Sequence, residues 1–487
     1  MLGAVLRLLA AVFTPGFLAS DDHHVVVAAA DRIASGAALA ETYARSALFP
    51  GVIGAIMAIG RSIGIHDPGA EMLVVRLIQA AYSLLVVYFV YRILERSLGR
   101  ESAILGGLLA AAFFAMPVTA VHQLEESVCQ VPLLAACWWW VRSEGAISRR
   151  PSAIWGALSG AALGLALILR FPLIGFVAAF LVLALLRPPP ATAVAKLAFL
   201  GGLAVALLLQ GSSNVLINQQ WGYSFTHRLG AMLHPVRMAV EADGYPNRPP
   251  WHYVLTLLAA LIPPASILLL AAAVKGAKQF PQLGVVTLAF LVTHSMIANK
   301  QERFLLPVLP VLFILIVAGL PWLRASIGPA YRGMWWYFGI VNTVLLVVLT
   351  FSPVKKDRVA PLLYVYRRHD ATGVLVAQYN QTFTVPQYYL GRDCAAEAAA
   401  RHVPVGGCRP PITVVTDRDS VDVPNIPINY VILYSDTPDA DQAALAGALN
   451  KRLTLVKIIA PSLADRLAHA INPRHNKAGT AAIYTTS

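Results

Sequence analysis

Acidic pairs and isolated basic residues recur at the ends of long apolar runs in this sequence. Asp21-Asp22 follows the first run directly, in FLASDDHHVVV, and Glu125-Glu126 lies between two later runs, in HQLEES. Arg303 stands immediately before FLLPVLPVLF. A carboxylate can take a proton from an attacking hydroxyl, and a cation can offset the charge that builds on a departing phosphate. This set would suit group transfer from a lipid phosphate to a hydroxyl at one membrane face.

Each acidic pair also has a structural interpretation. Asp is a preferred residue at helix starts, so Asp21 or Asp22 could cap a helix predicted over residues 25–33. Because a cap needs only one Asp, the pair favours a chemical role, with one Asp as the general base. Glu125 and Glu126 could be ordinary solvated residues of a short loop. Their predicted location on the same face as the Asp pair suggests that they bind the acceptor or orient the base.

The basic candidates are expected to bind the phosphate of a donor. Arg303 can pair with phosphate through two parallel hydrogen bonds, and Lys300 lies three residues before it. Arg170, held between two apolar runs by Phe171-Pro172, is a further candidate. The alternative for these residues is an interfacial anchor or a helix end. His252 begins another run and is an acceptor-binding or orienting candidate, although its neighbour Trp251 is also typical of an aromatic belt.

The elements that must position these residues are transmembrane helices. Of the 487 residues, 57% are apolar and only 13% are charged, and the mean hydropathy is +0.63, far from the balance of an average soluble domain. Runs of about 17 to 22 apolar residues are long enough to cross a bilayer as helices. We predict a polytopic α-helical membrane protein with eleven spans, at residues 3–19, 72–91, 102–120, 128–141, 153–169, 171–186, 194–210, 252–274, 281–297, 304–323 and 334–352.

The distribution of basic residues predicts the orientation of these spans. Alternate loops hold twelve Lys and Arg in roughly 45 residues, and the remaining segments hold nine in roughly 100. The first set is therefore cytoplasmic, and the long segments 20–71 and 211–251 face outside together with the C-terminal tail. The net charge of +13 then reflects orientation, and no nucleic-acid partner is expected.

Two N-terminal features allow a different topology. Residues 1–20 could be a cleaved signal peptide, but they lead directly into the acidic pair, which favours an uncleaved helix. Residues 46–65 could cross the membrane if Pro50 and Arg61 were tolerated, which would place the Asp pair in the cytoplasm. The uninterrupted apolar stretch at 52–60 is too short for a span, so an interfacial segment is expected.

The polar tail predicts a separate domain. Short β-branched runs at 412–417, 430–436 and 453–460 alternate with Ala-rich stretches, which indicates a soluble α/β domain over residues 354–487 after a membrane domain over 1–353. No nucleotide-binding glycine motif occurs in it. Cys129 and Cys137 are expected to be small core residues. Cys394 and Cys408 are expected to form a disulfide, which would fit an oxidising compartment.

Several of these segments together resemble glycosyltransferase family 22, the dolichyl-phosphate-mannose-dependent α-mannosyltransferases, over residues 1–330. Asp21-Asp22 matches the acidic DE-type pair of the family's first outside loop. Residues 41–50 (ETYARSALFP) resemble its WE…RS…P element, residues 248–253 (RPPWHY) its PWHWY element, and residues 299–310 (NKQERFLLPVLP) its HKExRFxxPxxP element. The last match departs at Asn299 and Gln301, where the family has His and Glu, and Ala40 stands where it has Trp.

The resemblance implies a GT-C fold of about 11 transmembrane helices and an inverting, metal-independent transfer without a cofactor. The donor would be a polyprenyl-phosphate sugar, carrying mannose or a related hexose or pentose, and the acceptor a glycan or glycolipid. Asp21 matches the family's Asp, and Glu41 becomes a candidate acceptor-binding residue. The Ala-rich composition favours a divergent bacterial relative in the inner membrane, with the active site and tail facing the periplasm.

Two other functions are compatible with many spans. A lipid or glycan transporter or flippase usually places polar residues near the bilayer midplane and shows internal repeats, whereas here the candidates cluster on one face and no repeat is seen. The chain could also serve only as a scaffold of an envelope complex through its tail. An assay with a labelled polyprenyl-phosphate sugar separates the three.

Overall fold

The computed structural model of the chain describes residues 1–37, 46–144, 148–186, 193–218, 248–297, 299–394, 408–418, 427–473 and 476–487. The chain forms two compact units, each built from segments that are not consecutive in sequence. Unit 1 comprises Met1–Leu8, Ala40–Phe49 and Gln79–Val347, and unit 2 comprises Leu9–Leu39, Pro50–Ile78 and Val348–Ser487. One division, at Val348, lies close to the domain boundary expected after residue 353. The grouping of the tail with residues that precede Gln79 was not expected.

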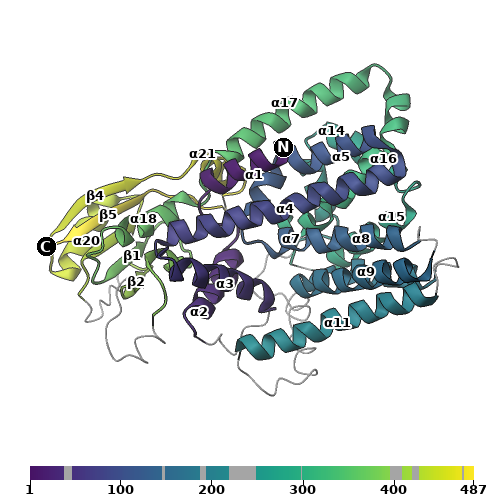
Figure 1. The fold of residues 1–487 in the computed structure, drawn as a ribbon. Helices are drawn as coiled ribbons and strands as arrows, with labels where there is room; N and C mark the ends of the chain where they lie inside the picture. Colours follow the sequence, from purple (N-terminus) through teal and green to yellow (C-terminus); the bar gives the residue numbers. More distant parts are fainter. Residues whose placement is uncertain are drawn as a thin grey trace. The chain divides into compact units, whose positions relative to one another are not determined.

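Unit 1 is helical. The first helix, α1 (Leu2–Phe13), begins in unit 1 and ends in unit 2, and α4 (Pro68–Leu98) begins in unit 2 and continues in unit 1. The elements that follow are α5 (Arg100–Ala112), α6 (Ala115–Val121), α7 (Glu125–Val128), α8 (Gln130–Glu144), α9 (Arg149–Leu169), η2 (Phe171–Leu173), α10 (Ile174–Leu186), α11 (Ala193–Asn218), α13 (His252–Ala260), α14 (Ala265–Gly276), α15 (Pro281–Met296), η3 (Glu302–Val308), α16 (Leu309–Ile327) and α17 (Ala330–Thr350). Within this unit α9 packs between α8 and α11 (Figure 1).

The described helices of the chain include several of membrane-spanning length. Four are long and apolar enough to cross a bilayer, and six are if each of two bent helix pairs counts as one span. The four are Pro68–Leu98, Arg150–Leu169, Glu302–Ile327 and Ala330–Thr350, and five shorter apolar helices accompany them. A helix lies within each of the eleven predicted spans, but their length and composition do not establish the count of eleven. The chain is an integral membrane protein.

Small residues allow close helix packing in unit 1. Gly156, Gly160 and Gly164 follow one another at intervals of four on α9 and face α11. A Cβ atom at Gly160 would lie 1.9 Å from the carbonyl oxygen of Phe199, so only glycine fits this crossing. Gly319 on α16 approaches α14 in the same way. Such contacts replace the hydrophobic driving force that helices lack inside a bilayer.

Unit 2 combines short helices with a five-stranded sheet. Its helical elements after the end of α1 are η1 (Asp22–Val27), α2 (Ala28–Ala34), α3 (Leu48–Ser62), the start of α4, α18 (Lys356–Tyr366), η4 (Gln387–Leu390), α20 (Pro438–Leu449) and α21 (Leu463–Ile471). The strands are β1 (Val374–Gln378), β2 (Ile412–Val415), β3 (Tyr430–Tyr434), β4 (Leu453–Ile459) and β5 (Ala481–Thr486), in the order β2-β1-β3-β5-β4 (Figure 1). The strands β1 to β3 are parallel and β5 is antiparallel to both neighbours. The three predicted strands correspond to β2, β3 and β4.

A buried ion-pair network connects distant parts of unit 2. The Arg61 guanidinium lies 2.7 Å from carboxylate oxygens of both Asp31 and Glu71. Arg409, far along the chain, lies 3.1 Å from the second oxygen of Asp31. The hydroxyl of Tyr388 donates to Glu71 at 2.7 Å. Both carboxylate side chains are almost fully buried, so the network ties the C-terminal part of the unit to α2, α3 and the start of α4.

The expected disulfide lies beside this network. Cys394 and Cys408 are bonded, with Cα atoms 5.6 Å apart, within the limit of about 7 Å for such a bond. The backbone N–H of Asp393 donates to Asp31 at 3.0 Å, and Arg409 follows the second cysteine. The disulfide thus fixes both chain segments that contact Asp31. The other two cysteines are buried and unbonded, as expected of core residues.

The network gives a stability prediction. Replacing Arg61 with methionine keeps an unbranched apolar side chain but leaves two carboxylates buried without their shared cation. We expect the free energy of unfolding to fall by about 3–5 kcal/mol, the usual result of breaking a buried pair. Unfolding by titration with sodium dodecyl sulfate in mixed micelles measures it.

The matched control is Arg367→Met. Arg367 pairs with Asp67 at 2.9 Å, but the two side chains are 58% and 31% exposed, so a loss below about 1 kcal/mol is expected. An equal loss in both variants would contradict the role given to burial.

Candidate active site

The predicted acidic pair lies at the start of a π-helical turn in unit 2. Asp22 is the first residue of η1, and π-helical turns occur frequently at functional sites. Asp22 is buried and its carboxylate accepts a hydrogen bond from the N–H of Ala19 at 2.9 Å. Asp21 is half-buried and makes no side-chain capping bond to the helix. The capping interpretation is therefore wrong for Asp21, and the two carboxylates differ in accessibility.

Aromatic and basic groups surround this pair within unit 2. His23 is fully buried, stacks on Tyr389 with ring centroids 5.3 Å apart and contacts the His24 ring edge-on at 4.9 Å. Burial lowers the pKa of both histidines, so they are neutral at pH 7. The ammonium of Lys355 lies over the ring of Phe17, 4.7 Å from its centroid, and burial lowers its pKa to about 8. A carboxylate here stands beside neutral imidazoles and a cation.

The second acidic pair forms a buried cluster in unit 1. Glu125 and Glu126 open the four-residue helix α7 and are only 5% and 2% exposed. Arg170 lies 2.9 Å from Glu126 and 3.7 Å from Glu125, and Arg303 lies 3.5 Å from Glu126. The interpretation of these acids as solvated loop residues is therefore wrong. Two carboxylates and two guanidinium groups balance in charge, as burial requires.

The elements around this cluster explain its geometry. Arg170 has extended backbone between the end of α9 and η2, where Pro172 begins a new turn. Arg303 lies in the first turn of η3, and its Nε donates to the side chain of Gln301 at 2.8 Å. Both guanidinium groups lie over the ring of Phe304, 4.7 and 5.5 Å from its centroid. Cation–π contacts with one ring thus hold both cations at the same place.

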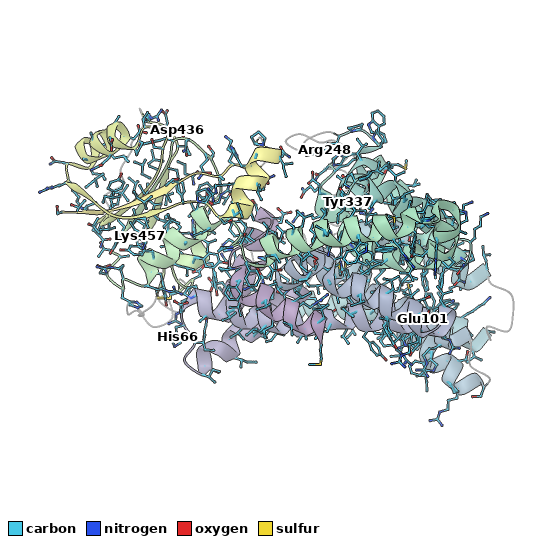
Figure 2. The ribbon with its side chains drawn as sticks, turned by 90° about the horizontal axis from the view of Figure 1, so that it is seen from above. His66, Glu101, Arg248, Tyr337, Asp436 and Lys457 are labelled. Carbon is cyan, nitrogen blue, oxygen red and sulfur yellow. A yellow bond between two sulfur atoms is a disulfide. The ribbon has the colours of Figure 1, made fainter. Side chains whose placement is uncertain are left out.

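The remaining predicted residues of unit 1 form a polar group beside η3. The Lys300 ammonium is buried and donates to the backbone carbonyls of Arg248, at 2.9 Å, and Ile297. Arg248, labelled in Figure 2, lies 3.2 Å from both Glu302 and the ring of His252. His252 is half-buried at the start of α13. Lys300 therefore joins two backbone segments, and Glu302 and His252 share one guanidinium.

One predicted site residue is not among those that the structure describes, and several residues near the candidate site were not predicted from the sequence. Glu41 lies outside the described residues. Lys355 and Tyr389 were not predicted, because they contact Phe17 and His23, the neighbours of the acidic pair, from segments more than 300 residues away. Phe304 was also missed, although its position next to Arg303 in the ERF motif was a usable signal.

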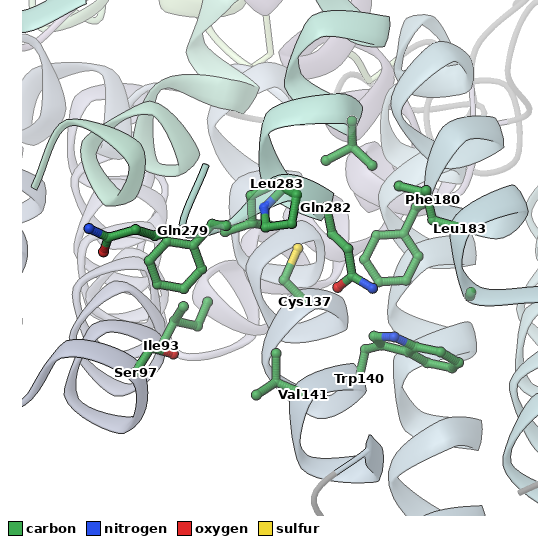
Figure 3. Close-up of a pocket in the computed structure, with 14 residues that line it drawn as sticks. Ile93, Ser97, Cys137, Trp140, Val141, Phe180, Leu183, Gln279, Gln282 and Leu283 are labelled. Carbon is green, nitrogen blue, oxygen red and sulfur yellow. The ribbon is translucent and has the colours of Figure 1, made fainter. Parts of the chain in front are cut away.

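A cavity of about 230 Å³ lies elsewhere in unit 1, among α4, α8, α10 and α15 (Figure 3). Its lining is largely apolar and includes Trp140, Phe180 and the thiol-bearing Cys137. Ser97 and Gln279 line it too, and both belong to loops predicted to be cytoplasmic. Among the described residues that line this cavity, none is a predicted site residue, so it is not assigned to the candidate active site.

Comparisons with known proteins place this arrangement in a fold class. A family model described as dolichyl-phosphate-mannose-protein mannosyltransferase matches residues 50–212, about a third of the chain. No curated protein matches the chain. The structure of ArnT from Cupriavidus metallidurans bound to undecaprenyl phosphate is similar with a TM-score of 0.60 and 13% identity, covering 99% of this chain and 96% of that one.

Two further structures are similar. ArnT from the same organism in the apo state gives a TM-score of 0.57 and 14% identity, with 99% and 96% of the two chains covered. The Archaeoglobus fulgidus oligosaccharyltransferase in the apo form gives 0.52 and 10% identity, covering 91% of this chain and 70% of that one. These structures are GT-C membrane glycosyltransferases. The predicted GT-C fold is therefore confirmed, and the tail of the chain contains a sheet.

Proposed function

We propose that this protein is a glycosyltransferase that moves a sugar from a polyprenyl-phosphate donor to a lipid-linked or envelope glycan acceptor. The sugar is mannose or a related hexose or pentose. The observation that carries the proposal is the fold, shared over 99% of the chain with ArnT, whose structure was solved bound to undecaprenyl phosphate. The match to a mannosyltransferase family model over residues 50–212 supports the same reaction class. The resemblance to glycosyltransferase family 22 remains part of the proposal.

Arg170 and Arg303 are the proposed ligands of the donor phosphate. Both guanidinium groups contact the carboxylate of Glu126 and the ring of Phe304. The two cations are therefore close together and partly desolvated. Preorganised cations in a water-poor site stabilise developing phosphate charge strongly. A phosphate between them would compete with Glu126 for the same donors. Lys300 acts in support, because its bonds to two backbone carbonyls hold the segment that precedes Arg303.

Asp21 is the proposed general base, because it is the more accessible residue of the pair. The acceptor hydroxyl attacks the anomeric carbon, the bond from this carbon to the phosphate oxygen breaks, and Asp21 takes the hydroxyl proton. The polyprenyl phosphate leaves as a stabilised anion, so no strong acid is needed on that side. Attack opposite the leaving group inverts the anomeric configuration. Arg170 and Arg303 supply the positive charge, so activity is expected in the presence of a chelator.

The other predicted residues are assigned to the acceptor. Hydrogen bonds from sugar hydroxyls can be accepted by the carboxylates of Glu125 and Glu126 and by the ring of His252. The two carboxylates also pair with the cations. Asp22, buried and bonded to the backbone, is assigned to positioning or acceptor binding. Glu41 keeps its predicted role as an acceptor-binding residue.

The orientation of the site can be tested through the tail. The proposal places the catalytic residues and residues 354–487 on the non-cytoplasmic face, in a bacterium the periplasm. Ala444 is exposed on α20, so an Ala444→Cys variant should react with a membrane-impermeant maleimide on intact spheroplasts. Arg332→Cys, in a predicted cytoplasmic loop, should react only after lysis. The reverse labelling pattern would place the tail in the cytoplasm and remove the proposed orientation.

The reaction itself is tested in proteoliposomes. Polyprenyl-phosphate mannose labelled in the sugar is supplied with a glycolipid extract from cells that lack the protein, and Asp21→Asn serves as the control. The expected result is label in the glycolipid with release of polyprenyl phosphate. Movement of intact donor across the bilayer would instead identify a flippase. If neither transfer nor movement is observed, the scaffold function is favoured.

A further inference from the structure

The helix α21 in unit 2 has an apolar face that none of the described residues covers. Leu463, Leu467 and Ile471 recur at intervals of four, which places them on one side of the helix. Their side chains are 49%, 46% and 85% exposed, and no residue of the helix is buried. The opposite side carries Asp465 and His469, and Arg466 lies at the edge of the apolar face. A helix with this division of apolar and charged faces is typical of segments that lie in a membrane interface.

The start of α21 is held rigidly to the segment that follows the last predicted span. The side chain of Asp465 accepts hydrogen bonds from the backbone N–H groups of Lys355 and Lys356, at 2.8 and 3.1 Å. The same carboxylate forms a capping box with Ser462. Lys355 comes five residues after Thr350, where α17 ends, so it lies within about 18 Å of that helix end even if the chain is fully extended.

Two predicted spans end together at this point. The rings of Phe13, at the end of α1, and Phe351 lie 5.2 Å apart. The N–H of Val354 donates to the carbonyl of Pro15 at 2.9 Å. The helices α1 and α17, which belong to the first and last predicted spans, therefore end beside each other, one residue before Lys355. In the predicted topology both helices leave the bilayer here, so α21 is attached at the predicted membrane boundary.

We propose that α21 lies in the membrane–water interface, with Leu463, Leu467 and Ile471 inserted among the lipid chains. The bilayer is the occupant that the location favours, because the helix is attached where two spans emerge. A second copy of the chain is less suited, since three side chains are a small fraction of the surface that a stable dimer buries. The exposed Arg466, at the edge of the apolar face, can contact lipid phosphates. The helix thereby gives the C-terminal domain its own contact with the bilayer, independently of any catalysis.

The test uses the full chain in lipid nanodiscs. Leu467→Cys is labelled with an environment-sensitive nitrobenzoxadiazole maleimide, and lipids with a nitroxide high on the acyl chain serve as quenchers. Arg466→Cys, at the edge of the apolar face of the same helix, and Ala444→Cys, exposed on α20, are the matched controls. Because Cys129 and Cys137 are buried and Cys394 is bonded to Cys408, the unmodified protein measures background labelling.

We expect at least threefold stronger lipid quenching at position 467 than at position 444, with position 466 intermediate. Ile471→Cys should behave like Leu467→Cys, which guards against a local effect of one substitution. Equal quenching at 467 and 444 would overturn the proposal. Weak quenching at 467 together with cross-linking of Leu467→Cys between two copies would overturn it in favour of a dimer contact.

Discussion

Replacing Asp21 with asparagine is expected to lower the turnover number at least about 100-fold while the donor still binds. Asparagine keeps the shape of the side chain and removes its basicity, so the acceptor hydroxyl loses its proton acceptor. Single-turnover transfer from labelled polyprenyl-phosphate mannose measures the rate, and binding of the unreacted donor is measured separately. The size of the effect is that of a lost general base.

The comparison with Asp22 makes this prediction specific. Asn at position 22 can still accept the hydrogen bond from the N–H of Ala19, so Asp22→Asn should fold and lose less activity. Asp67→Asn removes a carboxylate from an exposed pair and should leave turnover unchanged. Near-normal turnover in both Asp21→Asn and Asp22→Asn would show that the proposed site is wrong. Glu125 and Glu126 would then be the next bases to test.

Arg303→Ala is expected to cost roughly 2–4 kcal/mol of transition-state stabilisation, as does the loss of one preorganised donor at other sites. This corresponds to about a 30- to 1,000-fold fall in kcat/KM. The physical reason is that Arg170 would face the departing phosphate alone. Initial rates over a range of donor concentrations give kcat/KM, and undecaprenyl phosphate binding reports on the ground state.

The control for Arg303→Ala is the same substitution at an arginine on the other predicted side of the membrane. Arg332 is exposed in a predicted cytoplasmic loop, and Arg332→Ala should leave the rate unchanged. A folded Arg303→Ala variant with normal kcat/KM would make Arg303 a membrane anchor. A double substitution with Glu126→Gln extends the test, because the two side chains are in contact and a non-additive loss is expected.

Local patterns in the sequence predicted the elements well. A helix overlaps every predicted span, because a helix satisfies all the backbone hydrogen bonds of an apolar run, but only four to six of the described helices are long and apolar enough to cross a bilayer. The strands β2, β3 and β4 were predicted from β-branched runs. The strand β1 was missed, since Val374–Gln378 (VLVAQ) has only two β-branched residues whereas β2 (ITVV) is β-branched throughout, and β5 was missed within the last residues of the tail.

Contacts between distant segments were beyond such patterns. From its own loop Glu126 is expected to be solvated. It is buried because it pairs with Arg170 and Arg303, which follow it by 44 and 177 residues. The difference between Asp21 and Asp22 has a similar cause. Neighbouring carboxylates appear equivalent in sequence, but the π-helical turn directs one toward the backbone of Ala19 and leaves the other more accessible.

The buried network around Asp31 has a consequence for the order of events during synthesis. Asp31, Arg61 and Glu71 are made early and together carry one net negative charge. Their fourth partner, Arg409, follows Asp31 by 378 residues, which takes roughly 20–80 seconds at usual translation rates. Throughout that interval the excess negative charge of these three residues lacks its basic partner. The pairing is completed only when the tail has been made, so chains truncated before Arg409 would keep an incompletely paired Asp31 and would be expected to be more sensitive to proteases than complete ones.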